Sequence, residues 1–183
     1  MARKFSQRSL DNLLNVHPDL IRVVAAALAA SPVDFSVIEG RRTRERQAQL
    51  VKSGASRTMN SRHLHGLAVD LLPIDPKTGK GAFDWTLYHQ LGPAMKRAAA
   101  DLGIPITWGG DWTTFKDGPH FELPHALYPD GMKFKSMEPA NIAAAVPGSV
   151  LVPPIPNPEP EDTWRARIEE RLARLEMASI AAK

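Results

Sequence analysis

The stretch SRHLHGLAVD, Ser61 to Asp70, decides how this chain is built, because it joins a histidine-containing turn to a strand. Gly66 lets the backbone turn tightly, and the mainly apolar residues after it predict a strand over 67–72. Side chains alternate along a strand, so Asp70 lies on the opposite face from its two apolar neighbours. Taken alone, this spacing is also that of a surface histidine followed by a turn aspartate.

A second stretch, DGPHFEL (Asp117 to Leu123), supplies another histidine and another carboxylate. Gly118 and Pro119 predict a sharp turn before a strand over 120–123, which holds Asp117 and His120 on one rim. Two imidazoles and one carboxylate leave the fourth position of a zinc ion open for water, as in catalytic sites. A further carboxylate beside that water is what metal-assisted hydrolysis needs. An ordinary turn followed by a buried core histidine is the alternative explanation.

The spacing does not decide which histidine of the first stretch would face the metal. His63 and His65 are two residues apart, and in an extended segment such residues point to the same side. Both imidazoles therefore stay open as ligands at this point.

Composition limits the chemistry. The chain has 183 residues, 43% hydrophobic and 23% charged, enough for one globular domain with an appendage. It has no cysteine, so disulfides and thiolate metal sites are excluded and any metal must bind His and carboxylate. The net charge of +3 fits an anionic polymer as partner, but no basic run interleaved with aromatic residues indicates nucleic-acid binding. We expect no transmembrane segment and no signal peptide, because no apolar run is long enough.

Residues 1–135 are expected to form one catalytic domain. Helices are predicted after the capping residue Ser6, and over 19–30, 43–52 and 85–102. Strands are predicted over 35–38, 67–72, 104–108 and 120–123. Because helices and strands do not alternate regularly, we expect an α+β fold with a small antiparallel sheet and flanking helices that carry the mononuclear zinc site.

Residues 136–161 are expected to form an extended linker. From about residue 143 it is rich in prolines, which cannot lie inside a helix or a central strand; these are Pro147, Pro153, Pro154, Pro156, Pro158 and Pro160. Residues 162–183 then predict a C-terminal amphipathic helix, with Ile168, Leu172 and Leu175 on one stripe. This helix could self-associate weakly as a short coiled coil, or dock on its own domain.

Four further polar residues are candidates for substrate contact. Arg42 follows the first predicted strand, and its guanidinium could hold a substrate carboxylate or a developing oxyanion. Ser61, Gln47 and Asp111 are predicted near the same rim. The alternative for Arg42 is a solvated helix start, since other arginines surround it.

The pattern Ser61-x-His63-x-x-Gly66-x-Ala68-x-Asp70, followed by Asp117-x-x-His120, resembles the zinc-binding pattern of the M15 peptidases. This family contains D-alanyl-D-alanine carboxypeptidases and dipeptidases of the VanY and VanX type, and phage L-alanyl-D-glutamate endopeptidases. The resemblance covers most of residues 5–123, including EGRRTRERQ and ITWGGDW. Asp117 lies three residues before the last histidine. The carboxypeptidases typically have glutamate at this position, so in this respect the chain is similar to the phage endolysins.

The resemblance implies the roles of individual residues. The zinc ligands would be His63, Asp70 and His120. Asp117 would be the catalytic base, and Arg42 and Ser61 would contact substrate or stabilise the transition state. His65 is then expected to line the pocket or lie at the surface.

The resemblance also implies a function. The expected substrate is the peptidoglycan stem, cut between L-Ala and D-Glu by a phage or prophage endolysin during host lysis. The protein would be made in the host cytoplasm and would reach the wall through another factor. Alternatives are a D,D-carboxypeptidase or dipeptidase of the same family, and a virion-associated wall-degrading or non-catalytic wall-binding component.

Overall fold

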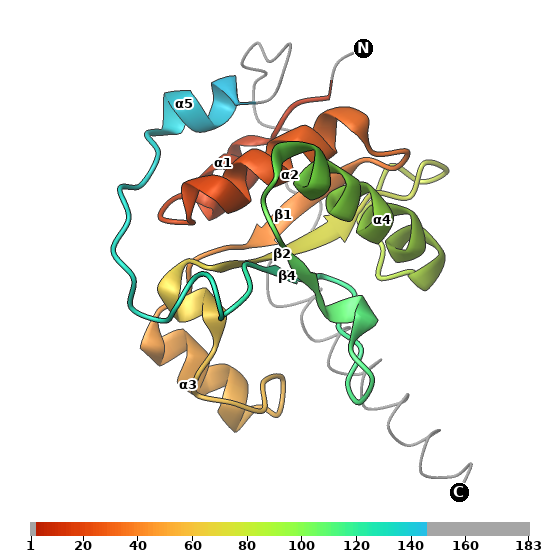
Figure 1. Ribbon diagram of the computed structural model, residues 1–183. Helices are drawn as coiled ribbons and strands as arrows, with labels where there is room; N and C mark the ends of the chain where they lie inside the picture. The colour runs from red at the N-terminus through yellow and green to blue at the C-terminus, as the bar shows by residue number, and fades with distance from the viewer. Residues whose placement is uncertain (1–2, 146–183) are drawn as a thin grey trace, which may run out of the picture.

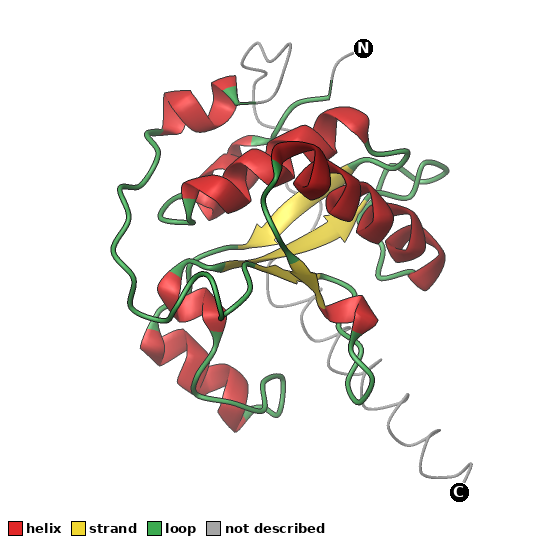
Figure 2. Cartoon of the chain, viewed as in Figure 1, coloured by secondary structure: helices red, strands yellow, loops and turns green. Residues whose placement is uncertain are grey.

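The computed structural model describes residues 3–145, which form an α+β fold (Figures 1 and 2). Four antiparallel strands make one sheet in the order β1-β2-β4-β3. The strands are β1 (Phe35–Glu39), β2 (Ala68–Pro73), β3 (Thr107–Trp108) and β4 (His120–Glu122). The α-helices are α1 (Gln7–Leu13), α2 (Pro18–Ala30), α3 (Arg44–Lys52), α4 (Trp85–Leu102) and α5 (Pro139–Ala144). Two short 3-10 helices are η1 (Arg62–His65) and η2 (Gly109–Asp111). The expected fold class is confirmed.

Three of the helices cover one face of the sheet. Figure 1 shows α1, α2 and α4 over that face, with α3 on the other side of the sheet. Between the sheet and its cover lies the apolar core, in which Leu28, Leu71, Met95 and Phe121 are fully buried. Burial of this apolar surface stabilises the sheet on which the polar site is built. Within residues 3–145, every helix is too short or too polar to span a lipid bilayer.

Local capping signals explain why the helices begin where the sequence predicts. The side chains of Ser6 and Thr43 accept hydrogen bonds from backbone N–H groups in the first turns of α1 and α3. Asp84 caps α4 in the same way, and Gly103 ends that helix in the left-handed conformation. Pro18 occupies the first turn of α2, where a missing N–H costs nothing.

A bulge in β1 shapes the site. Val37 pairs with Leu71, but the next pair is Glu39 with Asp70, so Ile38 is an extra residue in β1. On the other side of β2, Asp70 pairs with His120 of β4. The middle strand therefore holds Asp70 between a glutamate and a histidine from its two neighbours.

The structure differs from the predicted elements in three places. Strand β3 has two residues rather than the expected 104–108, because Pro105 has no N–H to donate to a ladder. Residues 62–65 form η1 rather than an extended segment, so the premise that His63 and His65 point to one side is wrong.

The third difference concerns the segment after residue 135. Helix α5 lies within the range expected to be linker, and it packs against α1 with Ile142 fully buried. Because Ile142 is buried against α1, the packed domain extends to about residue 145. The rest of the linker to residue 161 and the helix over 162–183 lie outside the described residues.

Candidate metal centre

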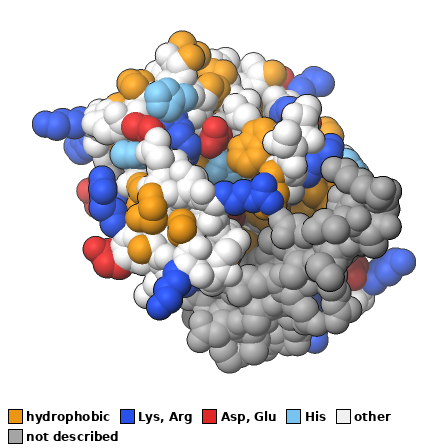
Figure 3. All heavy atoms as spheres, turned by 90° about the horizontal axis from the view of Figure 1, so that it is seen from below, with side chains coloured by type: hydrophobic (Ala, Val, Ile, Leu, Met, Phe, Trp, Pro, Cys, Tyr) orange, Lys and Arg blue, Asp and Glu red, His pale blue; other side chains and the backbone are white. Residues whose placement is uncertain are grey.

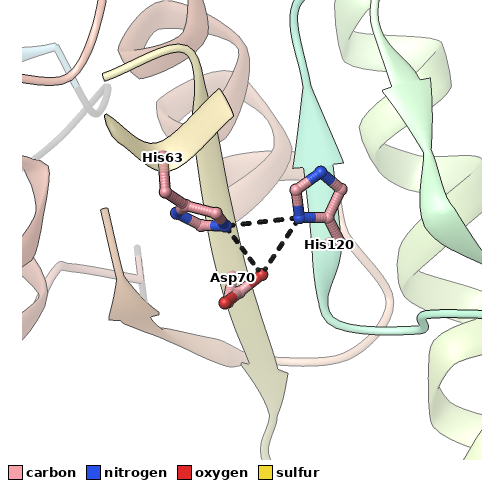
Figure 4. A group of neighbouring side chains, drawn as sticks. All are labelled: His63, Asp70 and His120. Atoms are coloured by element: carbon pink, nitrogen blue, oxygen red, sulfur yellow. Dashed lines mark hydrogen bonds and ion pairs between the residues drawn. The ribbon is translucent and has the colours of Figure 1, made fainter. Parts of the chain in front are cut away.

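His63, Asp70 and His120 converge on one point (Figure 4). The Oδ1 of Asp70 lies 3.3 Å from Nε2 of His63 and 3.4 Å from Nδ1 of His120, and these two nitrogens are 3.3 Å apart. Both histidines are buried and the Asp70 side chain is 18% exposed. Two imidazole nitrogens and one carboxylate oxygen at such separations can hold a metal ion.

Each ligand atom is brought in by a different element. Strands β2 and β4 set Asp70 opposite His120, and η1 brings in His63 from the segment before β2. Gly66 follows η1 in the left-handed conformation, with its amide bonded to the carbonyls of Arg62 and His63. A Cβ at Gly66 would lie 2.2 Å from the carbonyl oxygen of Asn15, so only glycine fits this turn.

Hydrogen bonds to the outer nitrogens orient both imidazoles. Nδ1 of His63 lies 2.7 Å from the carbonyl oxygen of Gly40, to which it donates when Nε2 is free of a proton. Nε2 of His120 lies 2.9 Å from Oε2 of Glu122. The remaining nitrogens, Nε2 of His63 and Nδ1 of His120, therefore face Asp70. Metal-binding histidines need this arrangement.

Charges inside the site strongly shift the pKa values of Asp70 and His120. Burial by itself would raise the pKa of Asp70, but the neighbouring His63 and His120 hold it well below its usual range. Burial would likewise lower the pKa of His120, but hydrogen bonds to Asp70 and Glu122 outweigh it and raise this pKa to about 10. In the metal-free protein His120 is therefore a cation between two carboxylates, and a metal ion would replace its Nδ1 proton.

Asp117 lies in the turn before β4. Its backbone N–H donates to the carbonyl of Gly109 at 3.0 Å, and the indole of Trp108 donates to the carbonyl of Gly118 at 2.8 Å. Burial and the negative charge of Asp70 raise the pKa of Asp117 to about 6. A carboxyl group with this pKa exchanges protons near neutral pH, which is what a general base and acid must do.

Arg42 is buried beside the metal group, but its guanidinium is engaged within the protein. Nε donates to Oε1 of Glu39 at 3.0 Å, Nη2 pairs with the other oxygen of Glu39, and Nη1 donates to Gln47 at 2.6 Å. Nη2 also lies 3.7 Å from Oδ2 of Asp70. These contacts set Arg42 against Asp70, and the expected role of its guanidinium in holding substrate or an oxyanion stays a prediction.

The other residues expected to bind substrate lie in different surroundings. Gln47 is fully buried, and its amide donates to Ser56 Oγ at 2.8 Å and the Thr58 carbonyl at 2.6 Å. Asp111 is 54% exposed and pairs with Lys96 at 2.9 Å. Gln47 thus reaches the metal group only through Arg42, and Asp111 pairs with a lysine on α4.

Ser61 directly precedes η1, and His65 is its last residue. Ser61 precedes the helix, and its side chain makes no capping hydrogen bond, so a role in binding substrate stays a prediction. His65 points elsewhere, with Nδ1 accepting the N–H of Gly131 at 3.3 Å and Nε2 3.9 Å from Asp130. The structure thus brings His63, and not His65, to the metal group.

Two loops border the site. The ring of Trp112 lies 5.2 Å from that of His120, and in the same loop the ring of Phe115 packs under Arg57, at 4.5 Å from its guanidinium carbon. Arg57 belongs to the loop after α3, so this contact joins the two loops. Figure 3 shows histidine and acidic side chains recessed beside hydrophobic and basic ones on this face.

Sequence reasoning missed Glu122 and the aromatic contact of Trp112. The signal for Glu122 was present, since His120 and Glu122 are two apart in a predicted strand and so share a face. The contact of Trp112 with His120 follows from the path of a loop and has no local signal.

Known proteins of one family resemble this chain. The family described as phage L-alanyl-D-glutamate peptidase matches residues 1–124. The L-alanyl-D-glutamate peptidase of Escherichia phage T5 is 32% identical over 137 residues, which cover 72% of this chain and 96% of that protein. The corresponding peptidase of Listeria phage A118 is 35% identical over 132 residues, or 70% of this chain and 45% of that protein.

A solved structure agrees. The crystal structure of the Serratia marcescens L-Ala D-Glu endopeptidase ChiX matches with a TM-score of 0.65 and 47% identity, over 70% of this chain and 95% of that one. The matched family region ends just after β4, and so contains all the residues of the metal group. This chain belongs to the phage L-alanyl-D-glutamate peptidase family.

Proposed function

We propose that this protein is a zinc peptidase that hydrolyses the L-Ala–D-Glu bond of peptidoglycan stem peptides, as a phage or prophage endolysin. The observation that carries the proposal is the convergence of His63, Asp70 and His120 beside Asp117, in a chain of this family. The ligand atoms are two nitrogens and one oxygen, a set that suits zinc and leaves a position open.

Zinc bound there would supply an acidified water and a Lewis acid for the scissile carbonyl. The protein's own residues supply the proton transfers. Asp117, with a pKa of about 6, accepts the proton of the attacking water and returns it to the leaving amine. Arg42 holds Asp70 in place through its Nη2 atom, 3.7 Å from Oδ2.

The surface beside the metal group supports a peptide substrate. Trp112 offers an apolar ring next to His120, and the loop with Arg57 offers positive charge. Stem peptides carry free carboxylates and short apolar side chains, so both kinds of contact suit them. We propose that the enzyme acts at the cell wall and is carried there by another factor.

Digestion of purified peptidoglycan tests the proposal. The zinc-loaded protein should release stem peptides cut after the first L-Ala, identified by mass spectrometry, while Asp117→Asn should release almost none. Free D-Ala and stems shortened at their carboxyl end would instead show a D,D-carboxypeptidase. Wall binding without any cleavage would show a non-catalytic wall-binding component.

The C-terminal segment is a separate question. We propose that residues 162–183 form a helix that associates weakly with a second copy, on the basis of its apolar stripe. Size-exclusion chromatography of the full chain over a range of concentrations tests this, and a mass of one copy throughout would contradict it.

A further inference from the structure

The two nitrogens of His120 face different groups. Figure 4 shows Nδ1 directed at Asp70 and His63, and the other ring nitrogen directed away from both. That second nitrogen, Nε2, lies 2.9 Å from Oε2 of Glu122. Both residues lie on β4, two positions apart, so the strand itself presents their side chains on one face.

We propose that Glu122 is a positioning residue for the metal centre, acting through His120. Its carboxylate accepts a hydrogen bond from the Nε2–H of His120, and this leaves Nδ1 as the unprotonated nitrogen that faces the metal ion. A neutral imidazole has one donor and one acceptor, so fixing the proton at Nε2 fixes the metal-binding atom as Nδ1. The inference rests on the proposed metal site.

The partner of His120 differs in kind from that of His63. His63 has a neutral backbone carbonyl, that of Gly40, at its outer nitrogen, whereas His120 has a carboxylate. A charge-assisted hydrogen bond is about twice as strong as a neutral one. Negative charge at the outer nitrogen also makes the inner nitrogen a better electron donor to a cation. Glu122 thus orients the ring and strengthens it as a ligand.

The surroundings of Glu122 favour this role over a purely structural one. Its side chain is 19% exposed, and among residues 3–145 His120 is the hydrogen-bond and ion-pair partner found for it. The pairing of β4 with β2 and β3 runs through backbone groups. Replacing the side chain therefore removes the contact to His120 and leaves the sheet ladder intact.

Metal affinity gives the first test, measured for Zn²⁺ by competition with a chromogenic chelator in the absence of substrate. Glu122→Ala should weaken binding by about 10- to 100-fold. Glu122→Gln should weaken it less, because the amide oxygen still accepts the proton. Asp101→Asn is the matched control; it removes an exposed carboxylate that pairs with Arg97 on α4, and it should bind like the wild type. A folded Glu122→Ala protein with wild-type affinity would overturn the inference.

The protonation state of the His120 ring gives the second test, and its deciding measurement is made on the wild type. In the zinc-loaded wild type, ¹⁵N NMR of labelled histidine should show a proton on Nε2 of His120 and a metal-bound Nδ1. In Glu122→Gln the Nε2 proton should exchange faster with water. A zinc-loaded wild type with the proton on Nδ1 would refute the role of Glu122, even where Glu122→Ala does not fold. Neither measurement uses peptidoglycan, so both stand apart from the outcome of the digestion experiment.

Discussion

Oδ2 of Asp70 lies 3.7 Å from Nη2 of Arg42, while Oδ1 of the same carboxylate faces the two histidines. The two oxygens thus have different partners, and Oδ1 is the one placed to bind a cation together with the histidines. Arg42 is itself fixed by Glu39, which the bulge in β1 sets opposite Asp70. A run of charged contacts therefore leads from the edge of the sheet to the metal group.

Removing Arg42 should mainly disturb stability and metal binding. Arg42→Ala removes the guanidinium that pairs with the largely buried Glu39 carboxylate, and breaking such a pair costs about 3–5 kcal/mol. Chemical denaturation measures this loss, and adding Glu39→Ala to it should recover part of the stability. Unchanged stability and zinc content with a large fall in kcat would instead support the oxyanion role first expected for Arg42.

His63→Ala should abolish tight metal binding, whereas His65→Ala should leave it unchanged. His63 supplies one of the converging nitrogens, and His65 contacts the segment at 130–131 instead. Zinc content after dialysis, measured by atomic emission, separates the two variants. Loss of zinc in His65→Ala, with zinc retained in His63→Ala, would reverse the assignment.

Asp117→Asn should keep the metal but lose most turnover, and its effect on stability should depend on pH. The folded-state pKa of Asp117 is raised to about 6 from 3.8, so its favourable contribution is present at low pH and is lost as pH rises through 6. Without metal, the variant should therefore be more stable than wild type at pH 8, by roughly 3 kcal/mol at 1.36 kcal/mol per pKa unit. Urea denaturation with chelator present should show this difference shrink toward pH 4. A difference that does not change with pH would contradict the raised pKa.

Zinc binding should release a proton from His120. The pKa of His120 in the metal-free protein is about 10, so at pH 8 the ion must displace a proton that is held there. Calorimetry in buffers of different ionisation enthalpy should detect at least one proton per ion. Apparent affinity should rise with pH, by about tenfold per unit for one exchanged proton. Binding without proton release would show that His120 is already neutral.

Gly109→Ala should damage turnover more than stability. A Cβ at this position would lie 2.5 Å from the backbone oxygen of Asp117 and 2.9 Å from its Cβ, so the proposed base must move. A displacement of about 1 Å can cost on the order of 100-fold in rate. Steady-state kinetics on a soluble muropeptide, together with the zinc content, measure the effect. A wild-type kcat would show that the loop absorbs the methyl group.

The sequence by itself determined helices α1 to α4, the main strands and the kind of ligands at the site. Ser6, Pro18 and Asp84 act on neighbouring backbone groups, so the starts of α1, α2 and α4 could be predicted from local signals. The absence of cysteine and the spacing around His63 and His120 limited the site to His and carboxylate ligands.

Only the tertiary structure decided how these groups face one another. The turn of η1 separates His63 from His65, the bulge in β1 brings Glu39 to Asp70, and loop packing sets Trp112 against His120. Each depends on strand register or on contacts between segments distant in sequence, and no local propensity encodes them. For the same reason Gln47, which the sequence suggested as a substrate contact at the rim, is buried and bonded to the guanidinium of Arg42.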